Sequence, residues 1–363
     1  MKKTEYTYDF WTLIMRRVSE INQSEKEYIR SYYSETKNDI FKIGCERKVI
    51  PFLAKTLIEL DIDVEFWSNH YLFYKKRNLS IVSLLDRLFQ DFSNNGILSP
   101  CLTENFAALL VSNNDVACFC SGDVDISADI NERNQIIECM IKHGFKIVKR
   151  KKYRNEIKQD ELICPPEKIK NFYINLVWKP VIRERDYSIN QKKVEAWLKN
   201  ERANSFRYSN TQIKLLSLES TLIHCIYHMS VGHYYCASPG IRLFTEIDWL
   251  LNDKTLNIDK LNDISVSLSI AKRVYTSIEL VELFLCPLKR IEQRIALSRK
   301  EKKQCESIIR SLTIRRKKSN IQLKEPTSSF ARLVIDSKSD QGPFIKCFFG
   351  KIVAFLTHSI HKS

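Results

Sequence analysis

The stretch FCSGDVDIS, residues 119–127, decides how we expect the chain to fold around it. Side chains alternate between the two faces of a β-strand, so Asp123 and Asp125 are expected on the same face. At a separation of roughly 7 Å along a strand, two carboxylates can share a hard divalent cation. Gly122 just before them lets a backbone come close to a phosphate, because it has no Cβ. The alternative is an edge strand whose polar face carries two aspartates.

Composition predicts an ordered globular protein. The chain has 363 residues, of which 44% are hydrophobic and 28% charged, with 8 Gly and 9 Pro, which is enough for a sizeable core and two domains. The eleven cysteines form no C-x-x-C pair and are expected to be buried free thiols in a reducing cytosol. Polar residues interrupt the N-terminal region, and no run of 18 apolar residues exists, so we expect a cytoplasmic protein.

The net charge of +15 is unevenly distributed. The basic tract, residues 287–318, contains twelve Lys or Arg against three Glu. Such a tract can bind an anionic partner such as nucleic acid, a membrane surface or a phosphorylated substrate, or it can be a solvated helix face. Residues 344–356 are apolar with two lysines, and they predict either a peripheral contact with the inner face of the membrane or docking on the protein's own core.

The patterning predicts four regions. Residues 1–97 read as helical, with apolar residues at helical spacing from Phe66 to Phe92 and a stop at Asn94-Asn95-Gly96. Residues 98–186 are expected to form an α+β core. Residues 187–336 read as a helical C-terminal region that includes the basic tract, and residues 337–363 as a connector with an amphipathic end.

Within the core, a helix is expected over residues 102–111 and one strand over residues 116–127. Asp129 is expected to cap a helix that Gly144 ends, and strands are expected at residues 145–148 and 172–178. The fold class is therefore α+β, with a small antiparallel or mixed sheet and helical regions on both sides of it in the sequence.

This order of a short helix, a strand with G-D-x-D, a helix ended by Gly and a later strand resembles the DNA polymerase beta-like nucleotidyltransferase superfamily. More closely, it resembles the bacterial group of uncharacterised nucleotidyltransferases, whose members often lie among capsule and polysaccharide biosynthesis genes. The resemblance covers most of residues 40–255. It includes a closing helix at residues 243–251. The resemblance rests on the order of the motifs.

The resemblance implies a transfer reaction and its site. Asp123 and Asp125 would bind Mg²⁺ together with a nucleoside triphosphate (NTP), and Ser121 and Gly122 would lie beside the triphosphate. A nucleoside monophosphate (NMP) would pass to an acceptor hydroxyl, and pyrophosphate would leave. Asn175 falls at the position of the third catalytic carboxylate.

Two positions depart from the pattern of the group. Glu104-Asn105 stands where the group has Lys-Gly, and an acidic side chain there is expected to repel phosphate. Asn175 keeps an oxygen ligand but lacks the charge of a carboxylate and cannot act as a base. The missing carboxylate could come from Glu156, Asp160 or Asp186. These departures leave three possibilities: an active enzyme, a catalytically degraded binding or regulatory module, and an RNA- or protein-directed nucleotidyltransferase of toxin–antitoxin type.

Four further residues are candidates for a substrate pocket. His228 and His233 fall where the group tends to have histidines. Arg242 and Asp248 flank an apolar stripe and could contact substrate or form a structural pair. His224 and His228 are at i and i+4 on an expected helix, which is metal-ligand spacing, although helix packing or a pocket role also accounts for it.

Overall fold

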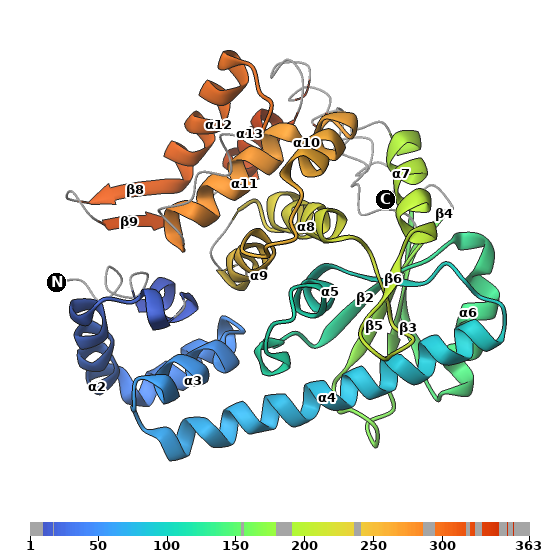
Figure 1. Cartoon of the computed structure of the whole chain (residues 1–363), viewed down its shortest axis with the longest axis horizontal. Helices are drawn as coiled ribbons and strands as arrows, with labels where there is room; N and C mark the ends of the chain where they lie inside the picture. The colour runs from blue at the N-terminus through green and yellow to red at the C-terminus, as the bar shows by residue number, and fades with distance from the viewer. Residues whose placement is uncertain are drawn as a thin grey trace.

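The computed structural model describes residues 10–16, 18–153, 156–178, 191–235, 241–285, 295–316, 320–323, 329–340, 347 and 351. Within these residues the chain is an α+β protein with a seven-stranded mixed sheet, and helices precede and follow the sheet in sequence (Figure 1). The predicted fold class is confirmed. The division into four regions stays a prediction.

Helices α2, α3 and α4 precede the sheet in the sequence. Helix α2 (Gln23–Glu46) begins with a capping box between Asn22 and Glu25, and α3 (Ile50–Glu59) has Pro51 in its first turn. Helix α4 (Val64–Asn94) is 31 residues long and runs from α3 towards the sheet (Figure 1). It contains the helix predicted over residues 66–92. Its buried face, which includes Leu85 and Phe89, packs into a core that is continuous with that of the sheet.

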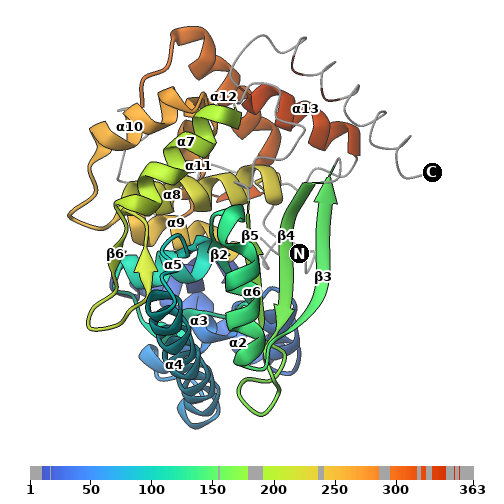
Figure 2. The ribbon, with the colours of Figure 1, turned by 90° about the vertical axis from the view of Figure 1, so that its right-hand side faces the viewer.

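The sheet has the order β3-β4-β5-β2-β1-β7-β6. Figure 2 shows β3 and β4 at one edge and β6 at the other. Strand β2 pairs with β5 in parallel and with β1 antiparallel, so the strand that carries the two aspartates lies in the middle. The strands are β1 (Cys101–Thr103), β2 (Asp123–Ser127), β3 (Lys146–Tyr153), β4 (Glu156–Ile163), β5 (Tyr173–Val177), β6 (Phe206–Arg207) and β7 (Lys214–Leu215).

Several predicted boundaries around β2 were wrong. Residues 116–118 form a 3-10 turn, and the strand begins only at Asp123. The Asp115 side chain accepts the N–H of Ala117 at 3.0 Å, and the buried Asn78 amide donates to Phe119 O at 2.8 Å. These side-chain bonds hold the segment in a turn, because they satisfy backbone groups that a strand would pair with its neighbours.

The helices on either side of β2 also begin later than predicted. Residues 101–103 pair with β2 as β1, so α5 (Glu104–Val111) starts at Glu104. Asp129 caps the 3-10 turn at residues 130–132, and α6 (Arg133–Lys142) follows it. Figure 1 shows the sheet with α5 on one side and α6 on the other. Strand β2 thus lies in the centre of the fold.

The C-terminal part of the chain is mostly helical. Helices α8, α9 and α11 pack on one another, and α8 and α9 contact α5. The remaining elements are α7 (Gln191–Ala203), α8 (Leu218–Tyr227), the π-helical turn η4 (His228–Gly232), α9 (Ile241–Leu251), α10 (Ile258–Ser267), α11 (Ala271–Phe284), α12 (Arg299–Leu312), β8 (Thr313–Arg316), β9 (Asn320–Leu323) and α13 (Ser329–Ser339). No described helix is both long and apolar enough to cross a bilayer.

The basic tract and the C-terminal segment are described only in part. Helix α12 buries one apolar face that includes Cys305 and Ile308, and it exposes basic residues such as Lys300 and Lys303. Residues 287–294 and 317–318 of the tract lie outside the described residues. Of residues 344–356, Cys347 and Lys351 are described, and both are buried.

Lys351 takes part in a buried network of charges. Its Nζ contacts Asp336 at 2.7 Å and Asp340 at 2.9 Å, and the same two aspartates contact Arg273 of α11 at 2.7 and 2.5 Å. This network ties α13 and residue 351 to α11. The described part of the C-terminal segment is therefore docked on the protein's own core.

A second buried carboxylate, Asp160 on β4, holds the outer strands to α6. It accepts from Arg133 Nε and Arg150 Nε at 2.7 Å each and from Trp178 Nε1 at 2.9 Å. Burial acts to raise the pKa of Asp160, but the hydrogen bonds from Arg133, Arg150 and Trp178 outweigh it and hold the pKa below its usual value. Asp160 is therefore a charged structural residue.

We expect Asp160→Ala to lower the free energy of unfolding by about 3 kcal/mol at pH 7, because it leaves two guanidinium groups without their shared partner. The matched control is Glu161→Ala, which removes a half-buried carboxylate from the next position of the same strand. Because the pKa of Asp160 is depressed in the folded state, its contribution is present above the unfolded pKa. The difference in the free energy of unfolding between Asp160→Ala and the wild-type protein should therefore become smaller only below about pH 4. Urea unfolding at several pH values measures this, and equal losses in both variants would contradict the assignment.

Candidate active site on strands β2 and β5

Asp123 and Asp125 lie on one face of β2, as the alternation predicts. Both are half-buried, whereas Val124 and Ile126 between and beside them are buried on the opposite face. Asn175 occupies the paired position on β5, directly beside Asp125. Its amide nitrogen donates to Asp123 Oδ2 and to Asp125 Oδ1, each at 3.1 Å. The structure thus brings together the three residues predicted as catalytic.

The Ser121-Gly122 turn leads into this pair. The Ser121 hydroxyl donates to Asp123 Oδ1, and Arg77 of α4 donates to the Ser121 carbonyl at 2.8 Å. Ser121, which was predicted to lie beside the triphosphate, thus has its hydroxyl hydrogen-bonded to an aspartate. A Cβ at Gly122 would meet only Asn171 O, at 3.5 Å, so the backbone does not require glycine at this position. The glycine leaves space beside Asp123, which a phosphate could use.

Glu104 stands at a backbone position that favours glycine. Its φ is +61°, in the left-handed region, which costs a residue with a Cβ about 1–2 kcal/mol. The left-handed backbone at Glu104 is thus retained although the residue carries a side chain. The buried Glu104 carboxylate contacts His228 Nδ1. The negative charge that we expected to repel phosphate is therefore paired with a histidine.

The two histidines predicted for a substrate pocket stack on one another. The rings of His228 and His233 are 4.9 Å apart and nearly parallel, and their Nε2 atoms are 2.9 Å apart. A Cβ at Gly232 would lie 3.1 Å from His228 Cδ2, a tight contact. A larger residue at position 232 would therefore press on the His228 ring.

Electrostatics keep His228 positively charged. Burial acts to lower the pKa of His228, but the charge and hydrogen bond of Glu104, with a further effect from Asp125, raise it to about 9. For Glu104, burial is likewise outweighed, and His228 holds the pKa of the carboxyl below its usual value. At neutral pH the pair is an imidazolium and a carboxylate.

The surroundings of Asp125 disfavour its ionised form. Burial, then the negative charges of Glu104 and Asp123, raise the pKa of Asp125 well above its usual range. A cation between Asp123 and Asp125 would relieve this repulsion. Hard carboxylate oxygens are the ligands that Mg²⁺ prefers, and the Asn175 amide could rotate to present its own oxygen. The donor set therefore fits Mg²⁺.

Arg242 adds a buried positive charge. With the Asn105 amide turned to satisfy both neighbours, Asn105 donates to Glu246 Oε2 at 2.8 Å and accepts from Arg242 Nη2 at 3.0 Å. Burial acts to lower the pKa of Arg242, but the charges of Glu246 and, to a smaller extent, Cys120 and Asp123 outweigh it and raise the pKa. Arg242 Nη1 is buried and has no hydrogen-bond partner among the described residues. A buried guanidinium N–H without a partner is a suitable donor for a phosphate oxygen.

Two other candidates have contacts outside this cluster. His224 stacks on Trp197, with 5.6 Å between the rings, which agrees with the helix-packing alternative. No group of three or more potential metal ligands among the described residues includes His224. Asp248 Oδ1 accepts from the Asn252 side chain at 2.8 Å. Asp248 follows Arg242 by six residues on α9, which corresponds to an angle of about 120° around the helix axis. The two side chains therefore lie on different faces of α9.

Of the three possible replacements for the third carboxylate, the structure describes the side chain of one. Asp160 pairs with Leu176, so it lies on the face opposite to Asn175, bound to two arginines. The Glu156 side chain and Asp186 lie outside the described residues. Glu161, which we had not singled out from the sequence, is paired directly with Asn175 and faces the same side one strand further out.

Sequence reasoning missed Glu246 and did not predict the partner of Glu104. Burial, together with the charge of Glu104, raises the pKa of Glu246 to about 7, although Arg242 and His228 oppose this. The i, i+4 spacing of Arg242 and Glu246 on one helix could have identified them as neighbours. The contact between Glu104 and His228 joins positions 124 residues apart, and no local pattern predicts it.

Comparison with known families agrees with this geometry. The sequence model of a protein family described as uncharacterised nucleotidyltransferase matches residues 35–286. Since the match covers more than half of the chain, the protein belongs to this family, and nucleotidyl transfer is the activity that the family indicates. A search of curated proteins finds no match.

Proposed function

We propose that this nucleotidyltransferase family member uses Mg²⁺ to move an NMP from an NTP to an acceptor hydroxyl. The observation that carries the proposal is the convergence of Asp123 and Asp125 on the Asn175 amide across β2 and β5. When bound there, Mg²⁺ would supply charge neutralisation for the triphosphate and a lowered pKa for the attacking hydroxyl.

The protein's own residues have distinct roles in the proposal. Asp123 and Asp125 hold the cation, and Asn175 fixes the position of both carboxylates. The free N–H of Arg242 binds a phosphate oxygen, and the His228 imidazolium, held by Glu104, offsets the negative charge that enters with the triphosphate. In this arrangement Glu104 acts through His228, so its negative charge does not face the phosphates unpaired.

The acceptor class comes from the resemblance. Because similar bacterial proteins lie among capsule and polysaccharide genes, the sugar hydroxyl of a surface-polysaccharide intermediate is the acceptor to test first, at the cytoplasmic side of the membrane. An RNA end and a protein hydroxyl are the competing acceptors. The exposed basic residues of α12 make RNA the more relevant of these two.

The test uses the full-length protein with each of the four NTPs labelled at the α-phosphate. With Mg²⁺, we expect label to appear in an acceptor and pyrophosphate to be released in equal amount, and we expect both to stop when the metal is chelated. Glycan intermediates, RNA and the protein itself serve as parallel acceptors. Tight nucleotide binding without pyrophosphate release would contradict transfer and would instead indicate a binding or regulatory module.

A further inference from the structure

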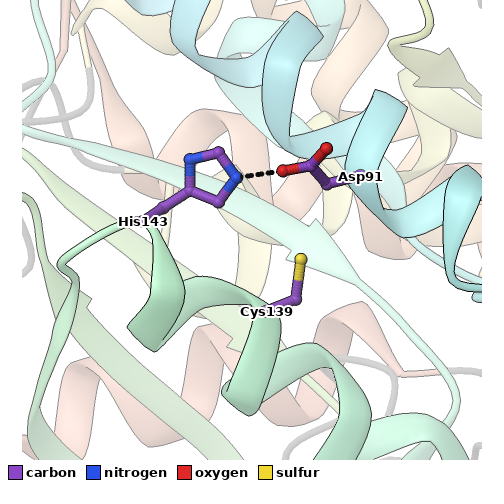
Figure 3. Close-up of side chains that lie close together, drawn as sticks. All are labelled: Asp91, Cys139 and His143. Atoms are coloured by element: carbon purple, nitrogen blue, oxygen red, sulfur yellow. Dashed lines mark hydrogen bonds and ion pairs between the residues drawn. The ribbon is translucent and has the colours of Figure 1, made fainter.

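A cluster of three metal-ligand side chains lies between α4 and α6, separate from the aspartates of β2. Asp91 comes from the last turns of α4, and Cys139 and His143 come from the C-terminal end of α6. Each offers one ligand atom, and these atoms all lie within 4.8 Å of one another. Figure 3 shows the His143 ring and the Asp91 carboxylate pointing at each other, with the Cys139 thiol directed towards the space beside them.

The fold holds these ligands in place. Cys139 and His143 are four residues apart, so helix geometry places them on one face. The start of α6 is fixed to the loop after α4, because the Glu132 carboxylate accepts the N–H groups of Leu98 and Ser99 at 3.2 and 3.0 Å. His143 Nε2 already lies 2.5 Å from Asp91 Oδ2. The two helices thus present a nearly assembled set of ligands.

The chemistry of the set selects the ion. A thiolate, an imidazole and a carboxylate together suit Zn²⁺, whereas Mg²⁺ requires oxygen ligands. Tetrahedral Zn²⁺ holds its ligand atoms about 3.3–3.8 Å apart, a spacing that small side-chain rotations can reach from the present positions. The Cys139 side chain is buried, while the side chain of Asp91 is 44% exposed, so an ion can enter from solvent and keep a water.

We propose that Asp91, Cys139 and His143 bind one Zn²⁺ ion, with water as the fourth ligand, and that this ion cross-links α4 to α6. On binding, the Cys139 thiol loses its proton to solvent, and the contact between His143 and Asp91 is replaced by two bonds to the metal. Helix α6 follows β2 closely in the chain. The ion would therefore stabilise the helices next to the strand that carries Asp123 and Asp125.

Spectroscopy with Co²⁺ as a substitute for Zn²⁺ tests the proposal on the full-length, metal-free protein. We expect a thiolate-to-cobalt charge-transfer band and tetrahedral d–d bands, both removed by stoichiometric Zn²⁺. Cys139→Ser should abolish the charge-transfer band and weaken Zn²⁺ binding by at least about 100-fold. Removing a ligand should lower metal affinity more than changing a residue that only hydrogen-bonds to a ligand. Zn²⁺ should raise the Tm of the wild-type protein but not that of Cys139→Ser.

Three further variants make the result specific. Asp91→Asn alters a partly exposed side chain that folding tolerates, and it should weaken binding as Cys139→Ser does. Cys45→Ser changes an exposed cysteine of α2 and should leave the spectrum unchanged. His228→Gln should also keep the thiolate band, because that histidine belongs to the other site. A wild-type spectrum without the band, or a band that survives in Cys139→Ser, would overturn the proposal.

Discussion

Replacing Asp123 and Asp125 together by asparagine is expected to abolish nucleotidyl transfer. The fall should exceed about 10³-fold, because several kcal/mol of charge stabilisation depend on a cation that two neutral amides bind poorly. The change keeps the shape of both side chains, and it removes the carboxylate of Asp125, whose pKa is raised by burial and then by the negative charges of Glu104 and Asp123. The fold should therefore be retained or become more stable while the activity is lost.

Pyrophosphate release at saturating NTP and Mg²⁺ measures this loss, with circular dichroism and thermal unfolding as checks on folding. Asp39→Asn is the matched control, since it removes one exposed carboxylate from α2, away from the sheet. The control should keep wild-type activity. Should the double variant retain transfer, the metal does not reside at Asp123 and Asp125, and the assignment of the site is wrong.

His228→Gln is expected to have the second-largest effect, a fall of about 10²-fold in kcat at pH 7, because it removes the charged donor that we propose for the triphosphate. The pH profile makes the test specific. The wild-type rate should stay high below the pKa of about 9 and decline above it, as His228 loses its proton. In His228→Gln this decline at high pH should be absent.

The variant Glu104→Gln tests whether Glu104 holds His228 in its charged form or only stabilises the fold. Without the carboxylate, burial should bring the pKa of His228 to about 6.5 or below, because Glu104 supplies the largest effect that raises it. The decline in rate should therefore move from about pH 9 to near neutral pH. Initial rates across this range test the shift. A decline that remains near pH 9 in Glu104→Gln would show that another group controls it.

Much of the architecture follows from local patterns. The helical spacing between Phe66 and Phe92 predicted most of α4, and the alternation around Val124 placed both aspartates on one face of β2. The segment before them was predicted wrongly, because the Asn78 side chain, 41 positions away from Phe119, holds it in a turn. Strand propensity has no information about such a distant partner.

The sequence by itself determined the α+β class, the family and the shared face of Asp123 and Asp125, because periodicity and the order of motifs are local properties of the chain. Only the tertiary structure decided that Asn175 bridges the two carboxylates and that Glu104 holds His228 as an imidazolium. It also decided that Asp91 meets Cys139 and His143. These contacts join residues that are distant in the chain, and their charges depend on burial, which exists only once the helices and strands have packed.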